Sequence, residues 1–172
     1  MRIDFEQRGG CKAHFPVFER HIRAVLPEMT STRMINTMWI TVKFVKTALV
    51  RRKSGRAGGT ATHHEYSKKT NGNKRKHLVI KIRRDKRISR QLTTCTHELM
   101  HCVQYASGRL KHRTIGGTKY WIWRPVGHKG KSLRYVRDRK AFLHNERPWE
   151  IEANTAQRKY DHIAQQSLRG AT

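Results

Sequence analysis

The stretch 94-TCTHELMHCVQ-104 contains two histidines four residues apart, His97 and His101, with Glu98 directly after the first. Residues four apart lie one turn above each other on the same face of a helix, so both imidazoles can reach one metal ion. In the HExxH pattern the two histidines bind zinc, and the intervening glutamate takes a proton from zinc-bound water. The stretch therefore predicts either a zinc site on a helix or, as the alternative interpretation, a helix with two surface histidines.

The residues around this motif predict a helix that runs from Arg87 or Ser89 to about Ala106 and ends at Gly108. We expect its apolar residues to form a buried face beside or opposite the histidines. Two cysteines of the helix are expected to be buried there and not to act as metal ligands. The predicted buried residues are Cys95, Leu99, Cys102, Val103 and Ala106.

Hydrophobic periodicity predicts further elements before and after this helix. Residues 13–28 form one amphipathic helix that ends near Pro27, and Pro148 opens a last helix that runs to about Gln166. Alternating apolar residues predict strands at 38–45 and 77–83, and a short strand at 119–125. The strand at 77–83 precedes the motif, as the substrate-binding edge strand does in zincins, and this resemblance implies an edge strand that could pair with an extended peptide substrate.

A third metal ligand is expected at the start of the last helix, because a catalytic zinc site normally has three protein ligands and a water molecule. The segment 147-RPWEIEANTAQ-157 offers Glu150 and Glu152. Acidic residues also stabilise the first turn of a helix without any metal. However, Glu150 lies at the edge of the predicted buried stripe of this helix, where an unpaired carboxylate is costly. The stripe consists of Trp149, Ala153, Ala156, Tyr160, Ile163 and Ala164. Asn154 follows Glu150 by one turn and could hydrogen-bond a ligand histidine.

Together, HELMH and 148-PWEIEAN-154 resemble the gluzincin class of zinc metallopeptidases, whose third ligand is a glutamate from a later helix. The second segment is similar to the ExEAN or ExEAD segment of the ImmA/IrrE and M48-type peptidases. With 105-YASG-108 between them, the motifs resemble small metallopeptidase-like proteins of tailed phages, over about residues 90–160. The resemblance implies that His97, His101 and Glu150 bind zinc, that Glu98 is the general base, and that Asn154 supports a ligand histidine. Asn154 departs from the more common Asp.

Two rival third ligands are left open. Glu152 is two residues from Glu150. His128 lies in 127-GHKG-130, which is similar to the segment that carries the third histidine of SprT-type proteases, although the full motif is absent. The extended metzincin pattern is also absent, because Gln104 stands at its glycine position. Tyr120, Tyr135 and His128 are candidates for stabilising the oxyanion of a peptide-cleavage intermediate.

The expected fold class is α+β: a compact zincin-like domain with a small, mostly antiparallel sheet, the HExxH helix, and a C-terminal helix that supplies the third ligand. The zincin topology is what the resemblance implies. We expect one domain over residues 1–172, with basic loop insertions near 46–76 and 127–140.

The charge of the chain predicts a polyanionic partner. Lys and Arg number 38 against 12 acidic residues, which gives a formal net charge of +26. Phosphate-backbone binding of nucleic acid, without base readout, would relieve the self-repulsion; an acidic protein substrate is the competing explanation. The residues expected to contact phosphates are Arg51, Arg52, Lys53, Lys74, Arg75, Lys76, Arg83, Arg84, Lys129 and Lys131.

The remaining features concern compartment and function class. Three cysteines without a CxxC pair predict a reducing compartment. Without a signal-like or membrane-spanning stretch, we expect a cytoplasmic protein, in the host cell or the virion if it is phage-encoded. The predicted function is a zinc metallopeptidase that hydrolyses a peptide or protein substrate on or near nucleic acid. The alternative is a basic nucleic-acid-binding or virion-packaged protein with an inactive zincin-like fold.

Overall fold

Two strands with alternating apolar residues form the centre of a four-stranded sheet. β2 (Met38–Val45) lies between β1 (Arg2–Glu6) and β8 (Lys76–Arg83), and β5 (Gly59–His64) forms the edge beyond β8. β1 and β8 both run parallel to β2, whereas β5 runs antiparallel to β8. The computed structural model describes residues 1–6, 12–45, 51–52, 55–56, 59–64, 69–70, 73–74, 76–136 and 146–170.

The strands at 38–45 and 77–83 are confirmed, but two expectations about their sheet are wrong. Two of its three strand pairings are parallel, so the sheet is not mostly antiparallel. The strand at 77–83 is internal, and β5 takes the edge position next to it. Alternation of apolar residues reports which face of a strand is buried, and it contains no information about neighbours or their direction.

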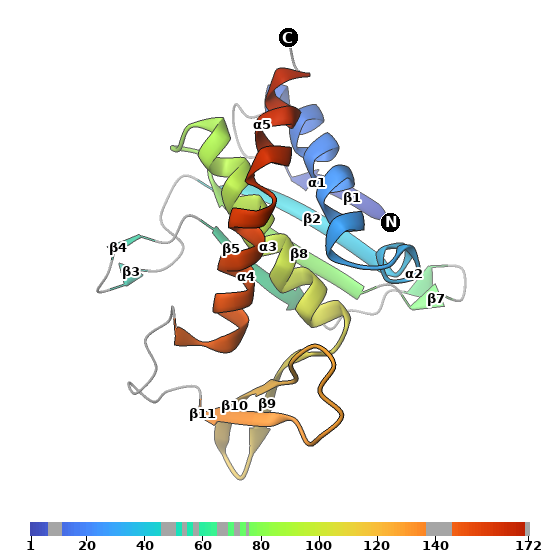
Figure 1. Ribbon diagram of the computed structural model, residues 1–172, viewed down its shortest axis with the longest axis vertical. Helices are drawn as coiled ribbons and strands as arrows, with labels where there is room; N and C mark the ends of the chain where they lie inside the picture. Colours follow the sequence, from blue (N-terminus) through green and yellow to red (C-terminus); the bar gives the residue numbers. More distant parts are fainter. Residues whose placement is uncertain are drawn as a thin grey trace.

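Helices cover one face of this sheet (Figure 1). α1 (Phe15–Met29) follows the short 3-10 helix η1 (Lys12–His14), and α2 (Thr32–Asn36) leads into β2. α3 (Ile88–Ala106) contacts β5 and β8 as well as α1. α4 (Pro148–Lys159) and α5 (Asp161–Arg169) pack against α3, and α5 also packs against α1.

The core lies between these helices and the sheet. The predicted stripe of the first helix is buried at Phe18, Ile22, Val25 and Leu26, and the apolar side chains of β2 and β8 face it from the sheet. All the predicted buried residues of the HExxH helix are buried as well. Gly108 comes directly after Ser107, the C-cap residue of this helix, and has φ +70°, a left-handed conformation that favours glycine and ends helices.

The last helix is interrupted, although the sequence predicts a continuous one. α4 ends at Lys159 and α5 begins at Asp161, with Tyr160 between them at φ −105° and ψ 13°. The Tyr160 ring is buried, and its hydroxyl donates a hydrogen bond to the carbonyl of Glu28, 2.8 Å away. The bend lets both halves of the predicted apolar stripe face the core.

A second, three-stranded antiparallel sheet lies beyond the end of α3 (Figure 1). It has the order β11-β10-β9, formed by β9 (Leu110–Ile115), β10 (Thr118–Trp123) and β11 (Leu133–Val136). Leu110 and Trp123 pack with Trp149 of α4 in a separate apolar cluster, and Tyr105 touches both this cluster and the main core. The sheet is therefore fixed to the first turn of α4.

Both segments expected to be basic loop insertions contribute strands. The segment near 46–76 contains β5 and two short hairpins, β3 (Arg51–Arg52) with β4 (Gly55–Arg56) and β6 (Lys69–Thr70) with β7 (Asn73–Lys74). The segment near 127–140 contains β11, and its residues 137–140 lie outside the described part of the chain. The many Lys, Arg and Gly residues in these segments obscure the alternation of apolar residues, so hydrophobic periodicity did not predict these strands. Across the described residues, none of the helices has the length and apolar character needed to cross a membrane.

Candidate metal centre

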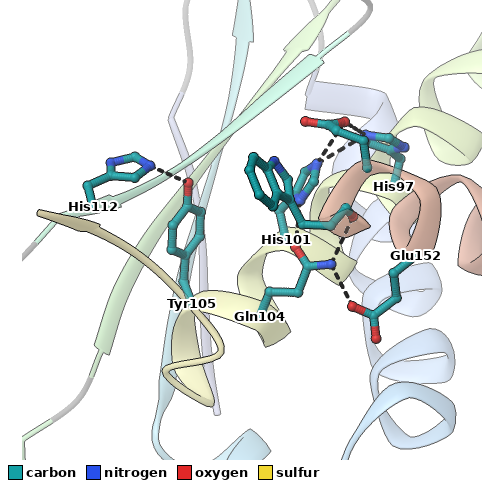
Figure 2. A network of polar contacts seen from close by, with 8 residues as sticks. His97, His101, Gln104, Tyr105, His112 and Glu152 are labelled. Atoms are coloured by element: carbon teal, nitrogen blue, oxygen red, sulfur yellow. Dashed lines mark hydrogen bonds and ion pairs between the residues drawn. The ribbon is translucent and has the colours of Figure 1, made fainter. Parts of the chain in front are cut away.

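The structure brings the two histidines of the HExxH motif and one glutamate of α4 together (Figure 2). Nε2 of His97 lies 3.1 Å from Nε2 of His101. One carboxylate oxygen of Glu150 lies 3.3 Å from the His97 nitrogen and 3.4 Å from the His101 nitrogen. We refer to His97, His101 and Glu150 as the triad.

The start of α4 is set by local sequence, and this fixes the position of Glu150. Pro148 occupies the first turn, where its missing N–H costs no hydrogen bond. Glu150 follows within the same turn, and the neighbouring Trp149 is buried to 1% exposure. A helix N-terminus stabilises a carboxylate by itself. Glu150 is only 5% exposed, and one of its carboxylate oxygens also faces the imidazoles of His97 and His101.

The spacing within the triad fits a tetrahedral metal ion. A zinc ion with bonds of about 2.0–2.1 Å to nitrogen and oxygen holds its ligand atoms about 3.3 Å apart. The three donor atoms form a triangle with sides of 3.1, 3.3 and 3.4 Å. Two imidazole nitrogens and a carboxylate oxygen leave a fourth position of such an ion open. The donor set therefore fits a catalytic type of metal site.

Gln104 orients His101 from behind. Its Oε1 lies 2.8 Å from Nδ1 of His101, while its Nε2 donates to the carbonyl of Trp149 (3.0 Å) and to Glu152 (2.8 Å). Because the amide NH₂ faces two acceptors, the amide oxygen must face the imidazole, and Nδ1 must carry a proton. The lone pair of the neutral His101 ring then lies on Nε2, which points into the triad.

The series of hydrogen bonds continues from Gln104 to Glu152, which forms a salt bridge with Arg109. Glu152 accepts hydrogen bonds from Arg109 at 2.9 and 3.0 Å, and the Arg109 guanidinium also lies over the Trp123 ring. Glu152 therefore has the role of holding Gln104, not of a third ligand in the triad. In the sequence, Gln104 stands out only as a departure from the metzincin pattern. Its signal was its position three residues after His101, which places it beside that histidine on a helix.

Charge in the buried site changes the pKa values around the motif. Burial lowers the pKa of His101, but the hydrogen bond that its ring donates to Glu150 and the negative charges of Glu98 and Glu150 outweigh it, raising the pKa to about 9. Burial, and to a lesser extent the charge of Glu98, raises the pKa of the Cys95 and Cys102 thiols. Both cysteines are buried and free, as the sequence predicted, and the protonated thiols are poor metal ligands.

The other predicted site residues lie as follows. Glu98 is 5% exposed in the middle of α3, close enough to raise the pKa of His101. Asn154 is partly buried one turn after Glu150, but the partner on Nδ1 of His101 is Gln104. His128 is exposed, with its Nε2 3.2 Å from the carbonyl of Lys131, and is not part of the triad.

The two tyrosines among the oxyanion candidates, Tyr120 and Tyr135, lie on opposite faces of the second sheet. Tyr135 pairs with Trp121, and its ring packs edge-on against Trp149 with centroids 5.4 Å apart. Tyr120 is the neighbour of Trp121 in β10, so its side chain points to the opposite face. Of the two, only Tyr135 lies on the side of the sheet that faces the start of α4.

The predicted phosphate-binding residues are dispersed. Arg83 is buried and paired with Asp85, which leaves it poorly placed for phosphate. Lys76 is exposed, and its ammonium donates to the carbonyl of Ala106 at the end of α3. Arg84 is partly buried, and Lys129 and Lys131 are exposed. Lys53 and Arg75 lie outside the described residues, as do the side chains of Arg51, Arg52 and Lys74 in β3 and β7.

Comparisons of the chain with protein-family models, with curated proteins and with solved structures found no match. The functional interpretation therefore rests on the triad and its surroundings.

Proposed function

We propose that this protein is a zinc-dependent metallopeptidase of gluzincin type that acts on or near nucleic acid. The observation that carries the proposal is the triad: two imidazole nitrogens and one carboxylate oxygen, 3.1 to 3.4 Å apart, on two helices. A His₂Glu set with an open fourth position is typical of catalytic zinc. Tetrahedral nitrogen and oxygen donors also favour zinc over the harder ions magnesium and calcium.

Each residue of the site has a chemical task in this proposal. His97, His101 and Glu150 would hold the ion, which when bound supplies Lewis acidity towards a carbonyl and a water of lowered pKa. Glu98 would accept the proton of the attacking water and pass it to the leaving amine. Gln104 keeps His101 in the tautomer whose Nε2 lone pair is free.

The variant Glu98→Gln tests the proposal, because it removes the proton acceptor and leaves the triad intact. We expect it to bind one zinc ion and to cleave fluorescent casein about 10²- to 10⁴-fold more slowly than wild type. His97→Ala is the matched control and should lose both zinc and cleavage. Casein is a generic probe, and assays with single-stranded DNA present would detect activity that depends on nucleic acid.

The alternative function is a basic nucleic-acid-binding protein whose metal site is inactive, and the net charge of +26 favours it. Wild-type protein that holds zinc and retains DNA, yet cleaves no faster than Glu98→Gln with or without DNA, would establish this alternative. A wild-type protein that takes up no zinc at all would refute both the peptidase and the metal site.

A further inference from the structure

The second sheet turns only one face towards the metal centre. Trp121 and Trp123 of β10 lie on that face, with ring centroids 5.3 and 6.1 Å from that of Trp149. Side chains alternate along a strand, so Tyr120 and Ile122 point away from α4. The second face of the sheet has no role in the proposed site.

The strand register places six side chains in two rows on this second face. Tyr120 is opposite Arg113 of β9 and Val136 of β11, and Ile122 is opposite Lys111 of β9 and Arg134 of β11. The four side chains on the outer strands are exposed, and the two on the central strand are partly buried. We call these residues the outer face: Lys111, Arg113, Tyr120, Ile122, Arg134 and Val136.

The outer face carries positive charges that no acidic side chain of its own three strands neutralises. The chain contains no Asp or Glu between residues 99 and 136, so none of the three strands contributes an acidic side chain. Among the described residues, no salt bridge involves Lys111, Arg113 or Arg134. Three cations surround one aromatic ring and apolar side chains, which is an arrangement suited to an anionic ligand with flat apolar parts.

We propose that the outer face binds single-stranded nucleic acid, with Tyr120 stacking on a base and Lys111, Arg113 and Arg134 contacting phosphates. Neighbouring strands lie about 4.8 Å apart, so the face is about 10 Å wide across its three strands and matches one nucleic-acid strand. Its six residues all lie on strands, and none is on a helix that could enter the groove of a duplex. An acidic peptide would satisfy the charges, but it would leave the aromatic ring without a stacking partner.

The outer face is separate from the proposed zinc site and yet close to it. The opposite face of the same sheet packs on Trp149, the residue directly before the metal-ligating Glu150. A bound strand would therefore lie beside the metal centre without touching it. The inference does not require the site to be active.

Fluorescence anisotropy with a labelled 20-nucleotide oligo-dT tests the inference on the full chain. Tyr120→Leu should weaken binding about tenfold, because stacking is lost, and Tyr120→Phe should bind as wild type does. Arg113→Gln combined with Arg134→Gln should reduce the slope of log affinity against log salt by about 1.4, for two lost phosphate contacts. The charge-matched control combines Arg33→Gln and Arg158→Gln, two exposed residues on α2 and α4, and should leave the slope unchanged.

Three results would overturn the inference. The first is an equal loss in the control double variant, which would mean that the net charge binds the oligonucleotide diffusely. The second is a duplex of the same length that binds more tightly than the single strand and whose affinity does not change in Tyr120→Leu. The third is equal competition by polyglutamate of matched charge. If Tyr120-dependent binding is found in a protein without protease activity, the proposed function fails and this inference stands.

Discussion

Nδ1 of His101 lies 2.8 Å from Oε1 of Gln104, whose NH₂ group bridges the Trp149 carbonyl and Glu152. His101 on α3, a proposed metal ligand, is thus linked through Gln104 to the backbone and a side chain of α4, the helix that carries Glu150. The same amide faces Nδ1 of His101 and connects the two helices beside the triad.

Replacing Gln104 should weaken metal binding without removing a ligand. We expect Gln104→Ala to lower zinc affinity about 10- to 100-fold, because the imidazole loses the acceptor that fixes its tautomer and orientation. Competition against a chromogenic zinc chelator measures this. The matched control is Gln165→Ala, an exposed glutamine on α5, which should bind zinc like wild type. Unchanged affinity in Gln104→Ala would contradict the proposed role of Gln104.

The two glutamates of α4 should differ sharply in metal binding. Glu150→Gln removes an anionic donor from the triad, and we expect it to lose stoichiometric zinc. Glu152→Gln keeps all three donors and disturbs only the contacts with Gln104 and Arg109, so it should retain one zinc per chain with reduced affinity. Metal analysis after gel filtration distinguishes them. Loss of zinc in Glu152→Gln with retention in Glu150→Gln would reverse the assignment.

His21 should make the folded state sensitive to acid. It is fully buried, with its Nε2 2.8 Å from Oγ1 of Thr96. Burial lowers its pKa to about 4, and the nearby charge of Asp161 offsets this only in part. Because the folded-state pKa is below the unfolded value near 6.5, stability is complete above pH 6.5 and falls as pH decreases towards 4. The loss between pH 7 and pH 4 should be about 3 kcal/mol.

Urea unfolding of wild type and His21→Leu at pH 7 and at pH 4 measures how much His21 contributes to this loss of stability. The variant cannot be protonated at this position, and the Thr96 hydroxyl keeps its hydrogen bond to the carbonyl of Leu92. Wild type should therefore lose about 3 kcal/mol more than the variant on acidification. Parallel losses in the two proteins would show that His21 is not responsible.

Trp149 should stabilise both the second sheet and the metal centre. It is 1% exposed and contacts aromatic rings from β10 and β11. Trp149→Ala should cost about 3–5 kcal/mol in the free energy of unfolding and weaken zinc binding, because the first turn of α4 loses its anchor. Trp149→Phe, which keeps a ring, should cost less in both measurements. Destabilisation with unchanged zinc affinity would mean that the sheet does not support Glu150.

Much of the fold follows from periodicity. Apolar residues three and four apart predicted α1 and α3, and alternation predicted β2 and β8 with their buried sides. The sequence predictions missed α2 and the short hairpins β3–β4 and β6–β7. They also missed four strands of the two larger sheets, β1, β5, β9 and β11, each four to six residues long. Their pairing depends on backbone hydrogen bonds to distant strands, which no local pattern of side chains records.

By itself, the sequence determined the parts of the site that are local: His97 and His101 share one face of α3 because they are four residues apart, and Pro148 places Glu150 in the first turn of α4. Only the tertiary structure decided which glutamate meets the histidines and which residue orients them. Packing of α4 on α3 turns Glu150 into the triad and Glu152 towards Gln104 and Arg109. Two residues separated by one position point about 200° apart around a helix axis, so the rotation of α4, set by the burial of Trp149, selects between them.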